Sequence, residues 1–179
     1  MARNAEGGAE VQFKSEKEYP SLDGIKEDYK TLRIISPAYA GGRGELTAVL
    51  QYVYQSILLG RLGKKDMSKT ILGIAINEMH HLELLGTAIT MLGAPPAFTA
   101  CLPYPIGYYS ASNVNYAKTP CEMIEADIIA ESNAIEDYRK ILTRISNEAL
   151  TLLIERIIED EELHLAAFKS MKKELSRCE

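Results

Sequence analysis

Four long segments of the chain repeat their hydrophobic residues at alternating steps of three and four, which is the spacing of one helical face. These segments cover about 45–59, 66–92, 119–142 and 147–176. Glycines at 60 and 63 follow the first segment, and Gly93-Ala94-Pro95-Pro96 follows the second. The pattern therefore predicts an all-α protein built on four helices.

Local signals mark where three of these helices begin. Thr119-Pro120-Cys121-Glu122 places a capping threonine before a proline at the first helical position and a glutamate at the third. Asp66 is predicted as the N-cap of the second helix, and Ser146-Asn147 precedes the fourth.

The connections between the helices predict how they are arranged. The first and second helices, like the third and fourth, are joined by very short turns and should form antiparallel pairs. Residues 97–118 are rich in Pro, Tyr, Ser and Asn, show no helical period, and need a structural reason at this length. A crossover supplies one, so we expect an antiparallel four-helix bundle with one long crossover between helices 2 and 3.

The first 39 residues are expected to lie outside this bundle, which would occupy 40–179. Residues 1–18 are polar and are predicted to form a loosely held tail. A short leading segment follows, in which residues 25–35 could form a helix that Pro37 ends.

Two Glu-x-x-His motifs lie on core-facing stripes of the second and fourth helices. Glu78 precedes His81 by three residues, and Glu161 precedes His164 by three, so each pair shares one helical face. A lone buried carboxylate costs several kcal/mol unless a cation or a donor compensates it. The motifs are either buried Glu–His hydrogen-bonded pairs or metal ligands, and two such pairs on core stripes favour metal.

The other two helices each add a glutamate to this inventory. Glu131 lies on the apolar stripe of the third helix, and Glu45 opens the first helix on one face with Val49 and Tyr52. Four carboxylates carry the charge that balances two divalent cations, and carboxylate with imidazole suits iron and manganese. Zinc in a closed structural site would more often recruit cysteine. The set predicts two iron or two manganese ions per chain.

Composition excludes several classes of partner. The 179 residues carry a formal net charge of −5, which argues against nucleic acid as a partner. No apolar run is long enough to span a membrane, and the N-terminus lacks the hydrophobic centre of a signal peptide, so we expect a cytoplasmic protein with no membrane partner. The three cysteines are widely spaced and indicate neither a disulfide framework nor a rubredoxin module.

The motifs resemble those of the ferritin-like superfamily over residues 40–175. The stretch 44–52 is similar to the metal-binding helix of bacterioferritins, rubrerythrins and manganese-catalase-like proteins, and 74–85 looks most like the second helix of manganese catalases. The resemblance implies a ferritin-like bundle in which Glu45 and Glu131 are terminal ligands and Glu78 and Glu161 bridge. His81 and His164 complete the two positions as terminal ligands.

Three further residues are candidates for supporting roles. The resemblance implies that Asp127 orients a ligand histidine. Tyr52 and Tyr138 either hydrogen-bond a ligand carboxylate or act in redox near the metals, or they are ordinary core tyrosines. Met79 occupies the position of a haem-ligating methionine in bacterioferritins, but methionine is a common core residue and we do not predict haem. Asp160 is expected to be a solvated surface charge.

These observations predict a dinuclear oxidoreductase acting on hydrogen peroxide or dioxygen, of catalase or peroxidase type. Rubrerythrins typically carry an extra glutamate where this chain has Ala134, and the missing residue and rubredoxin tail favour peroxide disproportionation, which needs no donor. Peroxide reduction would need a separate electron donor. The alternative is a non-catalytic metal-binding, storage or spore-associated structural protein. In either case we expect a homodimer or a higher homo-oligomer.

Overall fold

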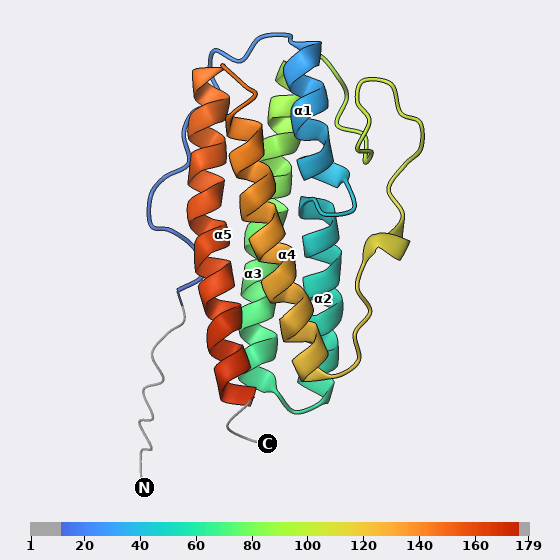
Figure 1. Ribbon diagram of the computed structural model, residues 1–179, viewed down its shortest axis with the longest axis vertical. Helices are drawn as coiled ribbons and strands as arrows, with labels where there is room; N and C mark the ends of the chain where they lie inside the picture. The colour runs from blue at the N-terminus through green and yellow to red at the C-terminus, as the bar shows by residue number, and fades with distance from the viewer. Residues whose placement is uncertain (1–11, 176–179) are drawn as a thin grey trace, which may run out of the picture.

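Four long helices lie side by side in the computed structural model, which describes residues 12–175 (Figure 1). The helices are α1 (Tyr29–Ala40), α2 (Glu45–Arg61), α3 (Lys65–Met91), α4 (Pro120–Leu142) and α5 (Glu148–Leu175), with a short 3-10 turn, η1 (Ala111–Asn113). No β-strand occurs among the described residues. The predicted all-α bundle is confirmed, and α1 is an additional short helix.

The chain path is that of two helical hairpins joined by one crossover. α2 and α3 form the first hairpin, and α4 and α5 form the second. Between α3 and α4 the chain runs the height of the bundle along its outside (Figure 1). The predicted crossover between the second and third long helices is therefore confirmed.

The predicted capping residues of the long helices are mostly confirmed. Thr119 and Glu122 form a complete capping box with proline at the start of α4. The Asn147 side chain accepts a hydrogen bond of 3.0 Å from the backbone N–H of Leu150 at the start of α5. Asp66 is not an N-cap, because α3 begins one residue earlier and places it in the first turn, where a carboxylate favours the helix dipole.

The sequence predicted that Pro37 ends the short leading helix, but the helix continues past this proline. α1 begins at Tyr29, capped by Asp28, and continues through Pro37 to Ala40. A proline removes one backbone donor from a helix, but Leu32, Ile35 and Tyr39 are buried on one side of α1. Tertiary packing therefore carries the helix past the proline.

A tight glycine turn joins α1 to α2, which lie end to end (Figure 1). A Cβ atom at Gly41 would lie 2.4 Å from the Pro37 carbonyl oxygen, and one at Gly44 would lie 2.3 Å from that of Ala38. Only glycine tolerates these approaches. The turn brings Glu45, the first residue of α2, directly into the bundle interior.

The N-terminal segment is held against α5 along its described part. The backbone N–H of Ser15 donates to Asp160 Oδ1 at 2.6 Å, and Arg156 donates to the carbonyls of Lys17 and Ser15 at 2.9 and 3.0 Å. The predicted loose tail is thus wrong for residues 12–18, because α5 offers buried charged partners. Residues 1–11 lie outside the described part.

Two apolar clusters divide the core of the bundle along its length. One includes Ile35 and Leu153 near the α1 end, and the other includes Ile71 and Phe168 near the α2–α3 turn. Along α3, α4 and α5, the buried polar residues other than Arg156 fall between these two clusters. Within residues 12–175 no helix is long and apolar enough to cross a membrane.

Candidate metal centre

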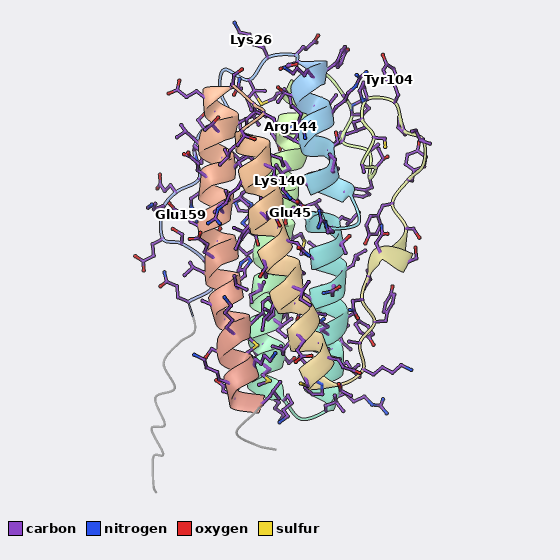
Figure 2. The ribbon with its side chains drawn as sticks, in the orientation of Figure 1. Lys26, Glu45, Tyr104, Lys140, Arg144 and Glu159 are labelled. Atoms are coloured by element: carbon purple, nitrogen blue, oxygen red, sulfur yellow. The ribbon has the colours of Figure 1, made fainter. Side chains whose placement is uncertain are left out.

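The six predicted ligands meet in the buried polar layer at the middle of the bundle. Each side chain comes from the helix that the sequence indicated: Glu45 from α2, Glu78 and His81 from α3, Glu131 from α4, and Glu161 and His164 from α5. None is more than 4% exposed. Figure 2 shows Glu45 in the interior, beside α4. Residues far apart in the sequence thus form one cluster.

The cluster contains two overlapping groups of four residues. One group is Glu45, Glu78, His81 and Glu161, and the other is Glu78, Glu131, Glu161 and His164. In each group the candidate ligand atoms all lie within 4.8 Å of one another. Because Glu78 and Glu161 belong to both groups, the geometry suits two adjacent cations that share two carboxylates.

Both histidines turn the same ring nitrogen towards the carboxylates. His81 Nδ1 lies 3.0 Å from Glu78 Oε2 and 3.3 Å from Glu161 Oε1. His164 Nδ1 lies 2.9 Å from Glu78 Oε1 and 3.3 Å from Glu161 Oε2. Nδ1 is therefore the candidate ligand atom on each ring.

The hydrogen bonding of the shared carboxylates is incomplete without a further partner. Glu78 Oε1 and Glu161 Oε1 are buried and make no hydrogen bond, although each lies close to a histidine Nδ1, because the bonding directions do not align. An unsatisfied buried polar atom costs about 1–3 kcal/mol, and more when charged. A cation between the carboxylates would satisfy both oxygens, so the donor set fits a pair of divalent metals.

Burial and mutual repulsion divide the carboxyl groups into two kinds. Burial, followed by repulsion from Glu78 and Glu161, raises the pKa of Glu45 and of Glu131 well above the usual range. Burial also acts to raise the pKa of Glu78, but the positive charge of the nearby His164, whose Nδ1 lies 2.9 Å from Glu78 Oε1, outweighs it and lowers that pKa. The pKa of Glu161 is also lowered, against burial and the repulsion of Glu78, by hydrogen bonds from both imidazoles.

The two imidazoles take up protons in return. Burial acts to lower the pKa of His164, but Glu78 and Glu161 raise it to about 9. The pKa of His81 is raised well above its ordinary value, against burial, by hydrogen bonds to Asp160 and to the nearby glutamates.

The directions of these shifts favour protonated imidazoles beside ionised Glu78 and Glu161 when no metal is bound. The raised pKa values of Glu45 and Glu131 favour their neutral forms. A metal that binds through these groups would displace their protons.

Tyr52 and Tyr138 each hydrogen-bond one carboxylate of the cluster. The Tyr52 hydroxyl donates to Glu131 Oε1, and the Tyr138 hydroxyl donates to Glu45 Oε1. Burial, and then the nearby carboxylates, raise the pKa of both phenols well above 10. Both tyrosines are therefore protonated donors that hold the two outer carboxylates, in addition to packing in the core.

Asp127 does not contact a histidine, contrary to the role implied by the resemblance. Its Oδ1 accepts hydrogen bonds from Gln51 Nε2 at 2.8 Å and Gln55 Nε2 at 2.9 Å. Burial raises the pKa of Asp127 to about 7. The two glutamines hold this carboxyl group on the α2 side of the bundle.

Asp160 makes the contact that was predicted for Asp127. It is fully buried, not solvated, and its Oδ2 lies 3.1 Å from His81 Nε2. The same oxygen accepts from Asn77 Nδ2 at 3.0 Å and from the Tyr19 hydroxyl at 2.5 Å. Arg156 Nη1 lies 2.7 Å from the other oxygen. The four-residue spacing of Arg156 and Asp160 is the sequence signal that could have indicated this buried pair.

Asp160→Asn should weaken metal binding by about 10- to 100-fold, because His81 loses the carboxylate that orients its ring. Titration calorimetry with Mn²⁺ on metal-free protein would measure the change. Glu159→Gln is the matched control, because the adjacent Glu159 carboxylate contacts Ser15 and Lys17 at the surface and makes no contact with His81 among the described residues. Equal affinity of the Asp160 variant and the control would contradict the orienting role.

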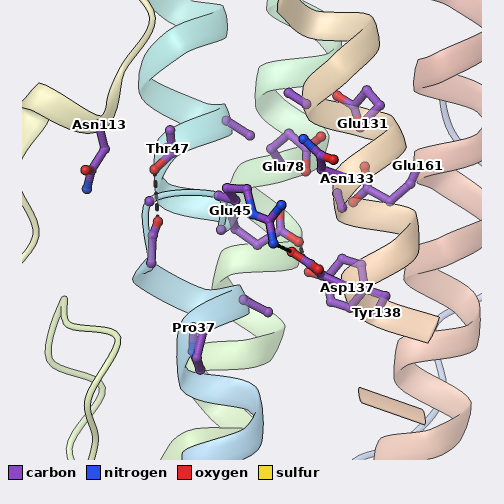
Figure 3. Close-up of a pocket in the computed structure, with 18 of the residues that line it drawn as sticks. Pro37, Glu45, Thr47, Glu78, Asn113, Glu131, Asn133, Asp137, Tyr138 and Glu161 are labelled. Atoms are coloured by element: carbon purple, nitrogen blue, oxygen red, sulfur yellow. Dashed lines mark hydrogen bonds and ion pairs between the residues drawn. The ribbon is translucent and has the colours of Figure 1, made fainter. Parts of the chain in front are cut away.

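A cavity of about 640 Å³ leads from the surface to the four carboxylates. Glu45, Glu78, Glu131 and Glu161 all line it, together with Tyr52 and Tyr138. Figure 3 shows Glu45 beside the α1–α2 turn, and Glu131 and Glu161 next to α4. On the far side of the carboxylates, His81 Nε2 contacts Asp160 and His164 Nε2 contacts Asn77. A small molecule would therefore approach the cluster from the carboxylate side.

This bundle and this cluster define a ferritin-like protein of the di-metal carboxylate superfamily. Residues 43–178 match the ferritin-like domain family, and the chain belongs to that family.

Known relatives and solved structures agree with this assignment. A bacterioferritin from Desulfovibrio desulfuricans is 26% identical over 153 residues, which cover 84% of this chain and 79% of the relative. A bacterioferritin from Rhodobacter capsulatus is 27% identical over 79% of this chain and 81% of the relative. The crystal structure of a manganese catalase from Anabaena superposes with a TM-score of 0.75 at 21% identity, over 90% of this chain and 80% of that chain.

Proposed function

We propose that this protein is a dinuclear iron or manganese oxidoreductase acting on hydrogen peroxide or dioxygen, and that it disproportionates peroxide. The observation that carries this proposal is the pair of ligand groups sharing Glu78 and Glu161. The cavity that reaches these carboxylates supports access by a small oxidant.

In this proposal each metal has its own imidazole and outer carboxylate. Glu45 and His81 would hold one ion, Glu131 and His164 the other, and Glu78 and Glu161 both. When bound, the metal pair supplies redox equivalents and Lewis acidity to an oxidant.

The surrounding side chains would fix the ligands. The hydroxyls of Tyr138 and Tyr52 hold Glu45 and Glu131, so these carboxylates keep their orientation towards the cavity. Asp160 holds Nε2 of His81, which leaves Nδ1 directed at the cluster. Such fixed donors reduce the rearrangement needed during turnover.

Peroxide disproportionation converts two molecules of peroxide into two of water and one of dioxygen, without an external donor. Ala134 supports this choice, because it lines the cavity where rubrerythrins have an additional carboxylate. The manganese catalase structure supports the fold only, since its identity to this chain is 21%.

Manganese-loaded protein should evolve oxygen from hydrogen peroxide without added reductant, and His164→Ala should abolish this activity. An oxygen electrode measures it directly. His80→Ala is the control, because the His80 ring lies partly exposed beside Glu83 and outside both ligand groups. Peroxide consumption seen only with a reductant, and only with iron, would overturn disproportionation in favour of peroxidase chemistry.

Metal storage is the second candidate, and the two bacterioferritin relatives favour it. Storage needs a closed shell of many subunits, so the size of the assembly decides between the candidates. A dimer or smaller assembly on size-exclusion chromatography would remove the storage proposal. The oligomeric state stays a prediction.

A further inference from the structure

The cavity above the carboxylates is long as well as deep. One wall follows a face of α4 from Ala126 to Ile141. Fifteen helical steps lead from the first of these residues to the last, a rise of about 22 Å. The facing wall comes from the end of α1, the glycine turn and the start of α2. The cavity therefore suits an elongated molecule.

The chemistry of the cavity changes along its length. Ala126, Ala130 and Ala134 give the α4 wall small apolar side chains, and the amides of Gln51, Asn115 and Asn133 also line the cavity. At the other end lie Lys140 and Arg144, which Figure 2 shows on the same side of the bundle as Glu45. An occupant would meet small apolar side chains and amides towards one end, and the cations together with Ile34 and Ile141 towards the other.

Among the described residues, one of the cations at that end forms no ion pair. Arg43 pairs with Asp137 at 2.7 Å across the cavity mouth, and Lys140 pairs with Glu136 at 2.7 Å. Arg144 has no ion pair within residues 12–175, and it also lines an adjoining hollow with Arg33. Asp137 is the only acid among the exposed or half-exposed described residues that line the cavity, and Glu136 lies beside Lys140, so the excess positive charge at the outer end is that of Arg144.

The size of the cavity exceeds what peroxide or dioxygen needs. Either oxidant occupies about the space of one or two waters, whose share of liquid volume is about 30 Å³ each. A volume of about 640 Å³ instead falls within the range of pockets that bind organic ligands.

We propose that the cavity binds an elongated apolar molecule with one anionic end, of the fatty carboxylate class. The anionic end lies at Arg144, and the apolar chain follows the alanines of α4 across the carboxylates of the metal centre. This inference deepens the proposed function by naming an organic ligand for the same site, and it does not depend on peroxide turnover.

Three features of affinity follow from this arrangement. Each added methylene should strengthen binding about fourfold until the chain fills the cavity. A carboxylate should bind more tightly than a trimethylammonium compound of equal chain length, because the outer end is positive. Binding should not require that the carboxylate coordinate a metal.

Titration calorimetry of the metal-loaded full chain with octanoate, decanoate and decyltrimethylammonium tests the proposal. Decanoate should bind saturably at one site per chain, Arg144→Ala should weaken it about tenfold, and Ala134→Phe should abolish it by filling the cavity. Matched controls are Arg139→Ala, a cation of α4 near Arg144 that pairs with Glu162 outside the cavity, and Ala166→Phe on the exposed side of α5. Both controls should bind like the unchanged chain.

Several results would overturn the proposal. These are the absence of saturable decanoate binding, equal binding of the cationic compound, or binding that both cavity variants leave unchanged. If decanoate binding is lost on metal removal and unchanged by Arg144→Ala, the carboxylate binds to the metal and not to Arg144. Metal content and oxygen evolution are measured separately from decanoate binding. Failure of this proposal can therefore be distinguished from failure of the proposed function.

Discussion

Glu161→Gln should reduce the bound metal from two ions per chain to less than one, whereas Glu162→Gln should retain both. Glu161 belongs to both ligand groups and is buried, so the substitution removes a shared carboxylate and a full negative charge. Glu162 is its exposed neighbour and pairs with Arg139 on the surface. Oxygen evolution by the Glu161 variant should fall at least a hundredfold, because the two positions lose their common ligand.

Metal analysis after gel filtration measures this difference, with circular dichroism to check that the variant is folded. The substitution should leave the helix content unchanged, since glutamine is a good helix former of nearly equal size. A folded Glu161 variant that retains two ions would contradict a bridging role for this residue.

Removing the metals should lower the melting temperature by more than about 10 °C at pH 8. Binding to the folded state alone contributes about 2.7 kcal/mol per site at a hundredfold excess over Kd. Two sites together contribute about 5 kcal/mol, and a chain of this size shifts by about 2–4 °C per kcal/mol. Differential scanning calorimetry with and without chelator measures the loss.

The difference in stability between loaded and metal-free protein should widen as the pH rises from 6 to 9. In the metal-free state, the raised pKa of His164, about 9, and that of His81 contribute stability below the unfolded value near 6.5, and this is lost as pH rises through the folded values. The raised pKa values of Glu45 and Glu131 act in the same direction, because their ionised forms are disfavoured in the fold.

In the loaded state these groups carry metal in place of protons, so rising pH favours metal binding. Equal melting temperatures with and without chelator across this range would contradict a buried metal centre. A difference that narrowed with rising pH would contradict the proton displacement.

The long helices and the buried positions of the candidate ligands could be predicted because both follow from periodicity. A helical stripe specifies which residues face the core, and it assigned Glu45, Glu78 and Glu131 to the interior. The spacing within each Glu-x-x-His motif then fixed the relation of carboxylate to imidazole. These are local properties of a helix, which a sequence carries directly.

The contacts to His81 Nε2 depend on packing between distant segments of the chain. Helical periodicity could not predict them. Asp160 lies beside a core stripe and resembles a surface charge until the N-terminal segment covers it with Tyr19 and Ser15. Asp127 lies one turn from Glu131, but it accepts hydrogen bonds from Gln51 and Gln55 of α2 and does not contact a histidine. The predicted helix end at Pro37 was wrong for a related reason, because the packing of α1 against the bundle outweighs one lost hydrogen bond.

Anomalous X-ray diffraction from crystals of protein grown with manganese tests the dinuclear centre most directly. The proposed site predicts two anomalous peaks in each chain, both contacting Glu78 and Glu161, with His81 on one and His164 on the other. Ordered Glu–His hydrogen bonds with no anomalous peak among these six residues, in protein supplied with both metals, would contradict it.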